Sequence, residues 1–458
     1  MTKDRAIDLM QPLRVHIVGV GGAGMSAIAS VLVAMGHDVS GSDLKDSPGL
    51  RRLESAGVRV YVGHHADHVG GADLVAVSTA IPERNPEVVE ANARGVRVVR
   101  RAEILAAIAS TRRCVAVSGT HGKTTTSSML ALALGQAGLE PSFIIGGELN
   151  EIGSGAVWGG GDLFVVEADE SDGTFVELPA SLAIVTNVEA DHLDYYGSLD
   201  AIEAAFDRFL EAPGPNVVCA DDPIAARLGR AHGAVLFGTS ADADVRIVDP
   251  VSERSGSSFT LVRGDTAIGE IRLPIPGLHN MRNATAATVA AMALGAPFEA
   301  CQAALARYAG VVRRFQYKGR ARGVTFVDDY AHNPGKVRAL LEAARAGRWG
   351  RVVCAFQPHR YSRTAALAAE FGDAFADADI VAIMDVYAAG EPPQPGITGK
   401  LVVDAVLDQH PWKRVAWVPG REDILAYLAL ELRPDDLCLT VGAGDVTSLS
   451  ADIVDRIT

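Results

Sequence analysis

The sequence predicts an α/β protein of three domains, each built on a mainly parallel sheet. Its 458 residues exceed what one hydrophobic core holds and suggest about three domains of ~150 residues each. Apolar residues make up 48% of the chain and charged residues 21%, a balance typical of folded proteins. Short runs rich in Val, Ile and Ala alternate with helical segments, as in parallel sheets. We expect domains at 1–111, 112–312 and 313–458.

Charge and cysteine content exclude several classes of protein. A formal net charge of −14 argues against a nucleic-acid partner. The N-terminus lacks a signal-peptide pattern, and no apolar run reaches the ~18 residues of a membrane span. The five cysteines are odd in number and widely spaced, which indicates reduced, buried thiols rather than a disulfide framework. We therefore expect a cytoplasmic enzyme without membrane insertion.

The first domain opens with a Rossmann-like βαβ unit. A strand over 13–20 leads into a glycine cluster, a helix over 25–35 and a second strand that closes on Asp43. The glycines of this cluster are Gly21, Gly22 and Gly24. Such a cluster lets a diphosphate approach a helix N-terminus, and the acidic residue lies where a ribose hydroxyl would sit. Alone, this unit would indicate a nicotinamide-dependent dehydrogenase.

Two further strand ends of the first domain carry polar residues. His64 follows a strand over 58–62, and Ser78 and Thr79 follow a strand over 73–77. Open α/β sheets bind ligands at the carboxyl ends of their strands. These residues are therefore candidates for substrate contacts.

A second phosphate loop begins the central domain, between an apolar strand over 114–118 and a helix that ends near Gln136. Glycines would turn backbone N–H groups toward an anion, and Lys123 would reach the terminal phosphates. A hydroxyl of Thr124 or Thr125 would hold Mg²⁺. The loop residues are Gly119, Thr120, His121, Gly122, Lys123, Thr124 and Thr125.

Two later strands of the central domain end in acidic and histidine residues. The strand over 163–166 delivers Glu167, and the strand over 182–185 is followed by His192. A carboxylate and an imidazole beside a phosphate loop could fix Mg²⁺. The remaining acidic residues of these segments, expected to be solvated loop charges, are Asp169, Glu170, Asp172 and Asp191.

Asn280 and Asn283 open an Ala-rich helix. Their amides could read the edge of an adenine or cap the helix, and the sequence leaves both roles open. The third domain again alternates strands and helices, and its strand ends present arginines and histidines. Such groups favour an anionic, carboxylate-bearing substrate. Its candidate residues are Arg314, Asp329, His332, His359, Arg360 and Arg363.

With these motifs in hand, the chain resembles the Mur ligase family along nearly its whole length. The shared motifs, in order, are GVGGAGM from Gly19, STAI from Ser78, GTHGKTTT from Gly119, EADESD from Glu167, TNVEADHLD from Thr186, GLHNMRN from Gly277, RRF from Arg313, DDYAHNP from Asp328, QPHRYSRT from Gln357 and GAGD from Gly442. The resemblance implies three α/β domains that bind a UDP-sugar, bind ATP, and carry the amino acid over the site.

The resemblance also implies an activity in peptidoglycan precursor synthesis. It is closest to members that use ATP to join L-alanine to UDP-N-acetylmuramate, and the partners would be these three small molecules. A member that recycles murein tripeptide onto the same sugar is the alternative. A Rossmann-type dehydrogenase or nicotinamide-binding regulator is the alternative from another class. We expect a monomer or weak homodimer.

The family implies a role for each matching residue. Diphosphate and uridine contacts fall on Gly21, Gly22, Gly24, Asp43 and His64. ATP, Mg²⁺ and adenine contacts fall on Lys123, Thr124, Glu167, His192, Asn280, Asn283, Arg314 and Asp329. Contacts with the incoming alanine and the closed site fall on His359, Arg360 and Arg363, and Ser78, Thr79 and His332 would also bind substrate. The catalytic residues would be Lys123, Glu167, His192, Arg314 and Arg360.

The sequence departs from the family pattern at two points. Some members have an asparagine where this chain has Ile145-Gly146-Gly147, which removes one phosphate or metal contact. Several members carry a carbamylated lysine in the central domain, yet no lysine occurs here between Lys123 and Lys318. Glu203 could supply an oxygen instead, although a solvated helix charge is the simpler expectation for it.

Overall fold

The computed structural model describes residues 7–78 and 80–457. They form two compact units. The first unit runs through residue 248 and includes 261–269 and 282–305. The second unit contains 249–260 and 270–281 and continues from residue 306. The three sheets are described in turn below.

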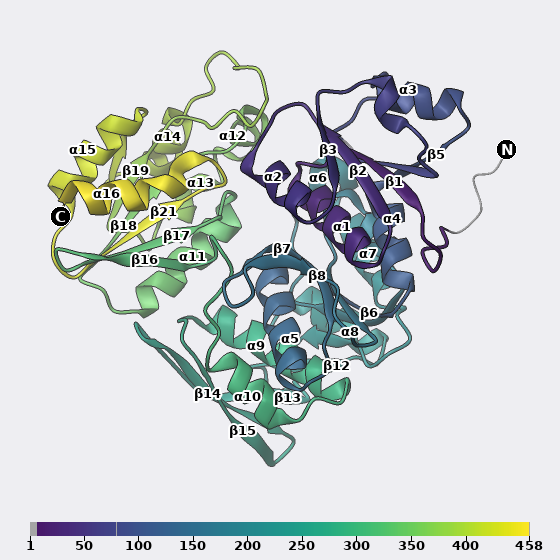
Figure 1. Ribbon diagram of the computed structural model, residues 1–458. Coiled ribbons are helices and arrows are strands. Elements are labelled where there is room, and N and C mark those ends of the chain that lie inside the picture. The colour runs from purple at the N-terminus through teal and green to yellow at the C-terminus, as the bar shows by residue number, and fades with distance from the viewer. Residues whose placement is uncertain (1–6, 79, 458) are drawn as a thin grey trace. The chain divides into compact units, whose positions relative to one another are not determined.

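The N-terminal sheet has five parallel strands in the order β3-β2-β1-β4-β5. Figure 1 labels β1, β2, β3 and β5 of this sheet. The strands are β1 Arg14–Val18, β2 Asp38–Asp43, β3 Arg59–Val62, β4 Leu74–Val77 and β5 Arg97–Arg100. The helices are α1 Ala23–Ala34, α2 Pro48–Ser55, α3 Pro86–Ala93 and α4 Arg101–Ser110. Strand order reverses between β1 and β4, so the first glycine loop lies at the switch point, where such sheets bind ligands. The predicted βαβ unit is confirmed.

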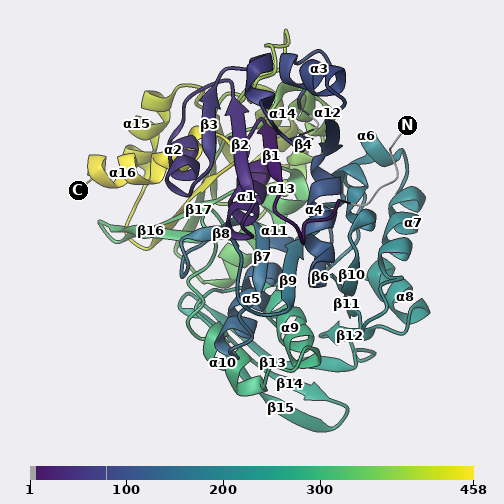
Figure 2. The same ribbon diagram turned by 45° about the vertical axis from the view of Figure 1, so that its right-hand side comes forward.

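The central sheet has the order β15-β14-β13-β12-β11-β10-β6-β9-β7-β8, which Figure 2 lets the reader follow from β7 through β9, β6 and β10 to β11. The strands are β6 Arg113–Ser118, β7 Ser142–Leu149, β8 Ser154–Val157, β9 Leu163–Glu167, β10 Ala180–Val185, β11 Val217–Cys219, β12 Val235–Gly238, β13 Val245–Glu253, β14 Gly256–Arg263 and β15 Thr266–Leu273. The helices are α5 Lys123–Gln136, α6 Leu193–Tyr196, α7 Leu199–Phe209, α8 Pro223–Ala231, α9 Leu278–Ala293 and α10 Phe298–Leu305. Because β6 lies between β9 and β10 and is parallel to both, the phosphate loop, Glu167 and the segment after β10 share one sheet edge.

The C-terminal sheet has six strands in the order β16-β17-β21-β18-β19-β20. Its strands are β16 Gln316–Ala321, β17 Val324–Asp329, β18 Arg351–Phe356, β19 Ile380–Ile383, β20 Arg414–Trp417 and β21 Asp436–Val441. Its helices are α11 Pro334–Ala346, α12 Tyr361–Leu367, α13 Phe371–Ala374, α14 Lys400–Gln409, α15 Arg421–Glu431 and α16 Leu449–Ile457. The pairs are parallel except for β16 with β17. The predicted class, a three-domain α/β protein with mainly parallel sheets, is therefore confirmed.

Apolar strands fill the cores of the three sheets, and β6, β9 and β18 are buried along most of their length. All five cysteines are buried, namely Cys114, Cys219, Cys301, Cys354 and Cys438. Burial raises the pKa of each of these thiols. Within residues 7–78 and 80–457, the helices are too short or too polar to cross a lipid bilayer.

Candidate active site

The phosphate loop joins the end of β6 to the start of α5 and depends on two glycines. Gly119 has a φ of +132° and Gly122 a φ of +84°, conformations that residues with a Cβ rarely adopt. A Cβ at Gly119 would also clash with the hydroxyl of Thr186. The N-terminus of α5 carries no side-chain cap, so its backbone N–H groups are available to an anion.

The segment after β10 holds this loop in shape. The side-chain amide of Asn187 pairs with the backbone of His121, accepting from its N–H at 2.8 Å and donating to its carbonyl at 3.0 Å. The N–H of Thr120 donates to the Asn187 carbonyl at 3.1 Å. The Thr120 hydroxyl in turn accepts from the N–H of Glu189 at 2.9 Å. The loop is thus held by the protein itself, which is the arrangement that preorganised phosphate sites need.

Lys123 forms a buried ion pair with Glu170. Its Nζ lies 2.9 Å from Oε1 and 2.8 Å from Oε2 of that carboxylate, and it also donates to the Gly119 carbonyl at 2.8 Å. The two side chains are 12% and 4% exposed. Burial alone would lower the pKa of Lys123, but the carboxylates of Glu170, Asp169 and Glu167 outweigh it and raise that pKa. Lys123 is therefore a charged amine beside the phosphate loop.

The expectation that Glu170 is a solvated loop charge is wrong. It begins a short 3₁₀ helix, Glu170–Asp172, whose N-cap is Asp169 with its side chain accepting from the Ser171 N–H at 3.1 Å. This turn buries the Glu170 carboxylate against Lys123. The other three carboxylates, Asp169, Asp172 and Asp191, are of intermediate exposure and keep contact with solvent. Asp172 lies 3.6 Å from Arg101, and Asp191 lies 3.7 Å from His192.

The residues assigned to Mg²⁺ converge on the same sheet edge. Glu167 accepts from the Thr124 hydroxyl at 3.1 Å and from the Gly146 N–H at 2.8 Å, so a backbone group contacts this site where some relatives have asparagine. His192 Nε2 lies 3.8 Å from Glu170 Oε1. The described part of the chain holds no cluster of three or more His, Cys, Asp or Glu that could bind a metal. The Thr124 hydroxyl and the Glu167 carboxylate offer the oxygen ligands that Mg²⁺ prefers, and substrate phosphates and water usually complete its shell, whereas the His192 imidazole offers a nitrogen, which suits Mg²⁺ less well.

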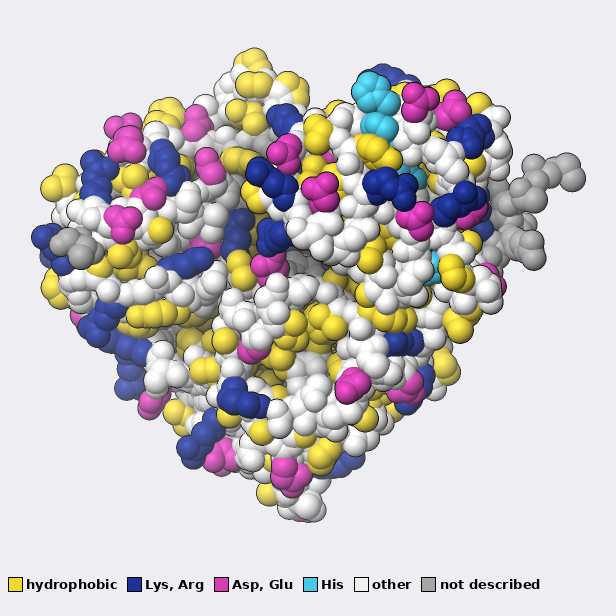
Figure 3. All heavy atoms as spheres, viewed as in Figure 1, with side chains coloured by type: hydrophobic (Ala, Val, Ile, Leu, Met, Phe, Trp, Pro, Cys, Tyr) yellow, Lys and Arg dark blue, Asp and Glu magenta, His cyan; other side chains and the backbone are white. Residues whose placement is uncertain are grey.

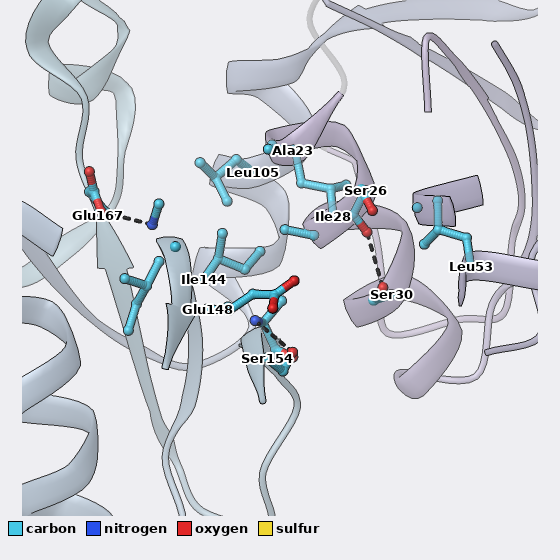
Figure 4. Close-up of a pocket in the computed structure, with 18 of the residues that line it drawn as sticks. Ala23, Ser26, Ile28, Ser30, Leu53, Leu105, Ile144, Glu148, Ser154 and Glu167 are labelled. Atoms are coloured by element: carbon cyan, nitrogen blue, oxygen red, sulfur yellow. Dashed lines mark hydrogen bonds between the residues drawn. The ribbon is translucent and has the colours of Figure 1, made fainter. Parts of the chain in front are cut away.

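A cavity of about 540 Å³ in the first unit lies between the first glycine loop and the β7–β8 hairpin, and Glu167 and Asp169 also line it. Figure 4 shows α1 on one side of it, and Ile144, Glu148 and Ser154 of the β7–β8 hairpin with Glu167 on the other. Gly21 and Gly24 also line it. The diphosphate site and a metal-site residue predicted from separate motifs therefore face one cavity.

Other residues predicted in the first domain lie around its glycine loop. The Asp43 carboxylate accepts from the N–H of Gly21 at 2.9 Å, and Gly22 is the uncapped N-cap of α1. His64 hydrogen-bonds through Nδ1 and is partly buried. The Ser78 carbonyl accepts from the N–H of Ile81 at 3.1 Å. Thr79 lies outside the described residues.

The two asparagines of α9 differ in environment. The Asn283 side chain accepts from the Thr126 hydroxyl at 3.3 Å and lies next to Gly122, so it belongs to the phosphate loop. Asn280 is buried and donates to the Pro276 carbonyl at 2.7 Å. This contact ties Asn280 to the chain just before its own helix but is not a cap, because an N-cap side chain accepts from a backbone N–H, so the adenine role remains open.

In the second unit, Arg314 and Asp329 lie near the end of β17. The Asp329 carboxylate accepts from the N–H groups of Phe315 at 2.7 Å and Ala331 at 2.8 Å. Burial raises the pKa of Asp329, although Arg314 opposes the shift. The Arg314 guanidinium lies 5.4 Å from the ring centre of Tyr330. These contacts fix the acidic group of the DDYAHNP motif.

The histidines and arginines expected at the amino-acid site also lie together in the second unit. The rings of His332 and His359 are 6.0 Å apart, and Arg363 Nη1 is 3.3 Å from His359 Nδ1. Burial lowers the pKa of His332 well below its usual value. Burial, Arg363 and Arg360 lower the pKa of His359 to about 4. Neutral imidazoles beside guanidinium groups favour an anion.

Sequence reasoning missed two residues that complete the phosphate loop. Glu170 was expected to be a solvated loop charge. Its position three residues after Glu167 could have indicated that it also lies near the phosphate loop. Asn187 went without a role, because the pairing of its amide with His121 joins residues 66 apart in the chain. Glu203, by contrast, pairs with Arg227 and is not part of this site.

Comparison with known proteins bears directly on this site. The description "Mur ligase family, catalytic domain" matches residues 14–113, "Mur ligase middle domain" matches 117–291, and "Mur ligase, glutamate ligase domain" matches 313–444. The chain belongs to the Mur ligase family. All three sheets described above lie largely within these matches, and so do the phosphate loop and the cavity.

Individual Mur ligases are similar over the full length. A UDP-N-acetylmuramate--L-alanine ligase from Rubrobacter xylanophilus is 46% identical over 97% of this chain and 100% of its own. One from Kineococcus radiotolerans is 50% identical over 97% and 96%. The crystal structure of a UDP-N-acetylmuramate-alanine ligase from Thermotoga maritima, 29% identical, has a TM-score of 0.82 and covers 97% of this chain and 99% of its own. A murein peptide ligase from Psychrobacter arcticus shares the fold with a TM-score of 0.69 over 97% and 98%, at 24% identity.

Proposed function

We propose that this Mur ligase joins L-alanine to the lactyl carboxylate of UDP-N-acetylmuramate and converts ATP to ADP and phosphate. The observation that carries the proposal is the cavity shared by Gly21 and Gly24 of the first glycine loop and by Glu167 beside the phosphate loop. A nucleotide sugar whose diphosphate lies on α1 can extend its carboxylate toward the ATP γ-phosphate there. The ligases that match at 46% and 50% identity carry this activity in their names.

In this mechanism the carboxylate attacks the γ-phosphate to give an acyl phosphate and ADP, and the amine of alanine then displaces phosphate. Lys123 holds the β- and γ-phosphates, and the N-terminus of α5 adds backbone donors. A bound Mg²⁺ would neutralise charge on the transferred phosphoryl group, and Thr124, Glu167 and His192 would hold it. The residues of the chain contribute to catalysis by positioning the reacting groups and by stabilising the charge on the transferred phosphoryl group.

The second unit supplies the remaining roles. Arg314 and Asp329 serve the nucleotide, and Asn280 lies at the adenine together with Asn283 of the first unit. The amino acid is held by His332, His359, Arg360 and Arg363, whose neutral imidazoles and guanidinium groups suit its carboxylate. Domain closure must bring these groups to the acyl phosphate. We also propose that the domain boundaries lie between residues 111 and 112 and between residues 312 and 313. The protein would be a monomer or a weak homodimer, and the reaction would take place in the cytoplasm.

Phosphate release by the purified protein tests the proposal. Release of ADP and phosphate should require both UDP-N-acetylmuramate and L-alanine. We expect some turnover with glycine and L-serine, because a methyl or hydroxyl changes binding by only about 1 to 3 kcal/mol. Turnover with L-alanyl tripeptide but not with free L-alanine would establish the recycling ligase instead. A nicotinamide absorbance change without ATP would establish a dehydrogenase.

A further inference from the structure

A buried carboxylate lies among three histidines of the N-terminal domain, and none of the roles above uses it. Glu87, in the first turn of α3, is fully buried. Its Oε1 lies 2.8 Å from His68 Nδ1, and its Oε2 lies 3.1 Å from His64 Nδ1. The Ser42 hydroxyl donates to Oε2 at 2.6 Å, and His16 Nε2 stands 3.7 Å from Oε1. We call these five residues the Glu87 cluster.

The Glu87 cluster is bonded to the first glycine loop. Ser42 is the next-to-last residue of β2, and its backbone carbonyl accepts from the N–H groups of Gly19 at 2.8 Å and Val20 at 3.0 Å. The side chain of the same serine donates to Glu87. Figure 3 shows histidine side chains, in cyan, on the surface of the N-terminal domain, at the end where β3 lies. Glu87 is thus two hydrogen bonds away from the diphosphate loop, through the side chain and the backbone carbonyl of Ser42.

The hydrogen bonds of the cluster determine where His64 carries its proton. A carboxylate accepts and cannot donate. Because Ser42 gives its hydroxyl proton to Glu87, the Ser42 oxygen is an acceptor toward His64 Nδ1, which lies 3.0 Å away. Both neighbours of Nδ1 are therefore acceptors, so Nδ1 must bear the hydrogen. In a neutral imidazole the other nitrogen, Nε2, is then an acceptor.

Nε2 of His64 makes no hydrogen bond to the described residues, since both polar side-chain contacts of this histidine are through Nδ1. The ring is partly exposed at the carboxyl end of β3, on the edge of the sheet where ligands bind. An acceptor in this position matches an N–H or O–H donor and does not match a phosphate oxygen.

We infer that Glu87 is a positioning residue that fixes the proton of His64 on Nδ1, so that Nε2 accepts a hydrogen bond from a donor of the nucleotide sugar. The inference rests on the proposed function, which brings uridine to this domain. Two donors have the required chemistry, the N3–H of uracil and a ribose hydroxyl. Neither contacts Glu87 itself, which acts through His64.

Two further observations support this role. Burial would raise the pKa of Glu87, but His16, Ser42 and His68 outweigh it and lower that pKa to about 2, so Glu87 is a carboxylate at neutral pH. His68 stacks on Tyr61 with ring centres 4.2 Å apart and planes at 8°. This stacking holds His68 against Glu87, and a positioning group needs such support from its neighbours.

The first test compares Glu87→Gln with Glu103→Gln. Each glutamate lies in the first turn of a helix of this domain, but Glu103 pairs with Arg97 and Arg100 and has no assigned role. A Gln at 87 must place an N–H₂ group against Ser42 and His64 or against His68. We expect KM for UDP-N-acetylmuramate to rise about 10- to 100-fold in Glu87→Gln, with kcat and the KM for L-alanine within about twofold. Unchanged KM in both variants would overturn the inference.

The second test reads the proton position directly. Nitrogen-15 NMR of histidine-labelled enzyme distinguishes Nδ1–H, Nε2–H and the imidazolium, and a His64→Gln spectrum assigns the signal. We expect the Nδ1–H form in the wild-type protein and loss of that form in Glu87→Gln. An Nε2–H form or an imidazolium in the wild-type protein at neutral pH overturns the inference, and this holds even if Glu87→Gln does not fold.

Calorimetry with nucleotide analogues identifies the donor. A CDP-sugar lacks the N3–H, and a 2′-deoxy UDP-sugar lacks one ribose hydroxyl. The analogue whose binding penalty disappears in Glu87→Gln lacks the donor that His64 reads. If both penalties survive in Glu87→Gln, the inference is wrong. If the wild-type protein does not bind UDP-N-acetylmuramate at all, the proposed function itself fails, so the two failures are distinguishable.

Discussion

Replacing Glu170 with Gln should destabilise the protein without nucleotide and tighten its binding of nucleotide. The substitution keeps the shape of the side chain but removes the carboxylate that lies 2.8 Å from Lys123 Nζ. Lys123 would remain buried with a charge and without its nearest counter-charge. Phosphate groups of a bound nucleotide would restore a negative charge beside the same amine.

The size of the effect follows from the geometry. Two unit charges 2.8 Å apart attract by about 6 kcal/mol at an effective dielectric constant of ~20. Asp169 and Glu167 also act on Lys123 and would compensate in part, so we expect a net loss of about 3 kcal/mol, as for other broken buried ion pairs. If nucleotide phosphates recover about 2 kcal/mol of it, ADP should bind the variant roughly 30-fold more tightly than it binds the wild-type protein.

Urea unfolding with and without ADP and Mg²⁺ measures both effects. Asp172→Asn is the matched control, because it neutralises a carboxylate in the same 3₁₀ helix that lies near Arg101 instead of Lys123. The control should change the free energy of unfolding by less than about 1 kcal/mol. An equal loss of stability in Glu170→Gln with and without ADP would refute the reasoning, because the phosphates would then not be replacing Glu170.

Three further predictions concern rate, carbon dioxide and pH. Lys123→Ala should reduce phosphate release at least about 100-fold while UDP-sugar binding persists, and near-normal turnover in a phosphate assay would contradict the assignment. Removing bicarbonate from the assay should leave the rate unchanged, because residues 124–317 contain no lysine to carbamylate; a rate restored by added bicarbonate would contradict this. The pKa of His359 falls from 6.5 to about 4 on folding, so the unfolded chain binds that proton more tightly and stability should fall as the pH is lowered through this window. His359→Gln should flatten that part of the unfolding profile, and an identical pH dependence in both proteins would show that His359 does not titrate as described.

The sequence predicted most of the strands because buried parallel strands are short apolar runs that end in glycine or polar residues. The strands over 73–77, 114–118 and 163–166 were predicted in this way and match β4, β6 and β9. β7 and β8 were missed, although they line the cavity. Four glycines interrupt the apolar runs of these strands, namely Gly146, Gly147, Gly153 and Gly155. Glycine normally weakens a strand. Here β7 and β8 pair with each other, and β7 also pairs with β9, contacts that no local pattern reveals.

The residues of the candidate site likewise fall into those that local sequence motifs predict and those that only the structure reveals. Lys123, Glu167 and the glycine loops lie in motifs whose spacing indicates their chemistry, so the sequence was sufficient to propose them. Glu170 and Glu87 have little local signature, since an acidic residue in a loop or in a helical first turn is usually a solvated charge or a helix-terminus charge. Their importance comes from partners distant in the chain, such as Lys123 for Glu170 and His64 for Glu87. Only a three-dimensional arrangement shows that these charges are buried.

The buried cysteine thiols can be used to detect local unfolding of each unit. Cys114, Cys219 and Cys301 belong to the first unit, and Cys354 and Cys438 to the second. A thiol must be exposed and ionised before an alkylating reagent can attack it, so burial and raised pKa values protect all five in the folded state. A short pulse of iodoacetamide followed by peptide mass spectrometry should therefore record which unit has opened. Modification of Cys354 and Cys438 ahead of the other three would identify the second unit as the one that unfolds at lower free energy.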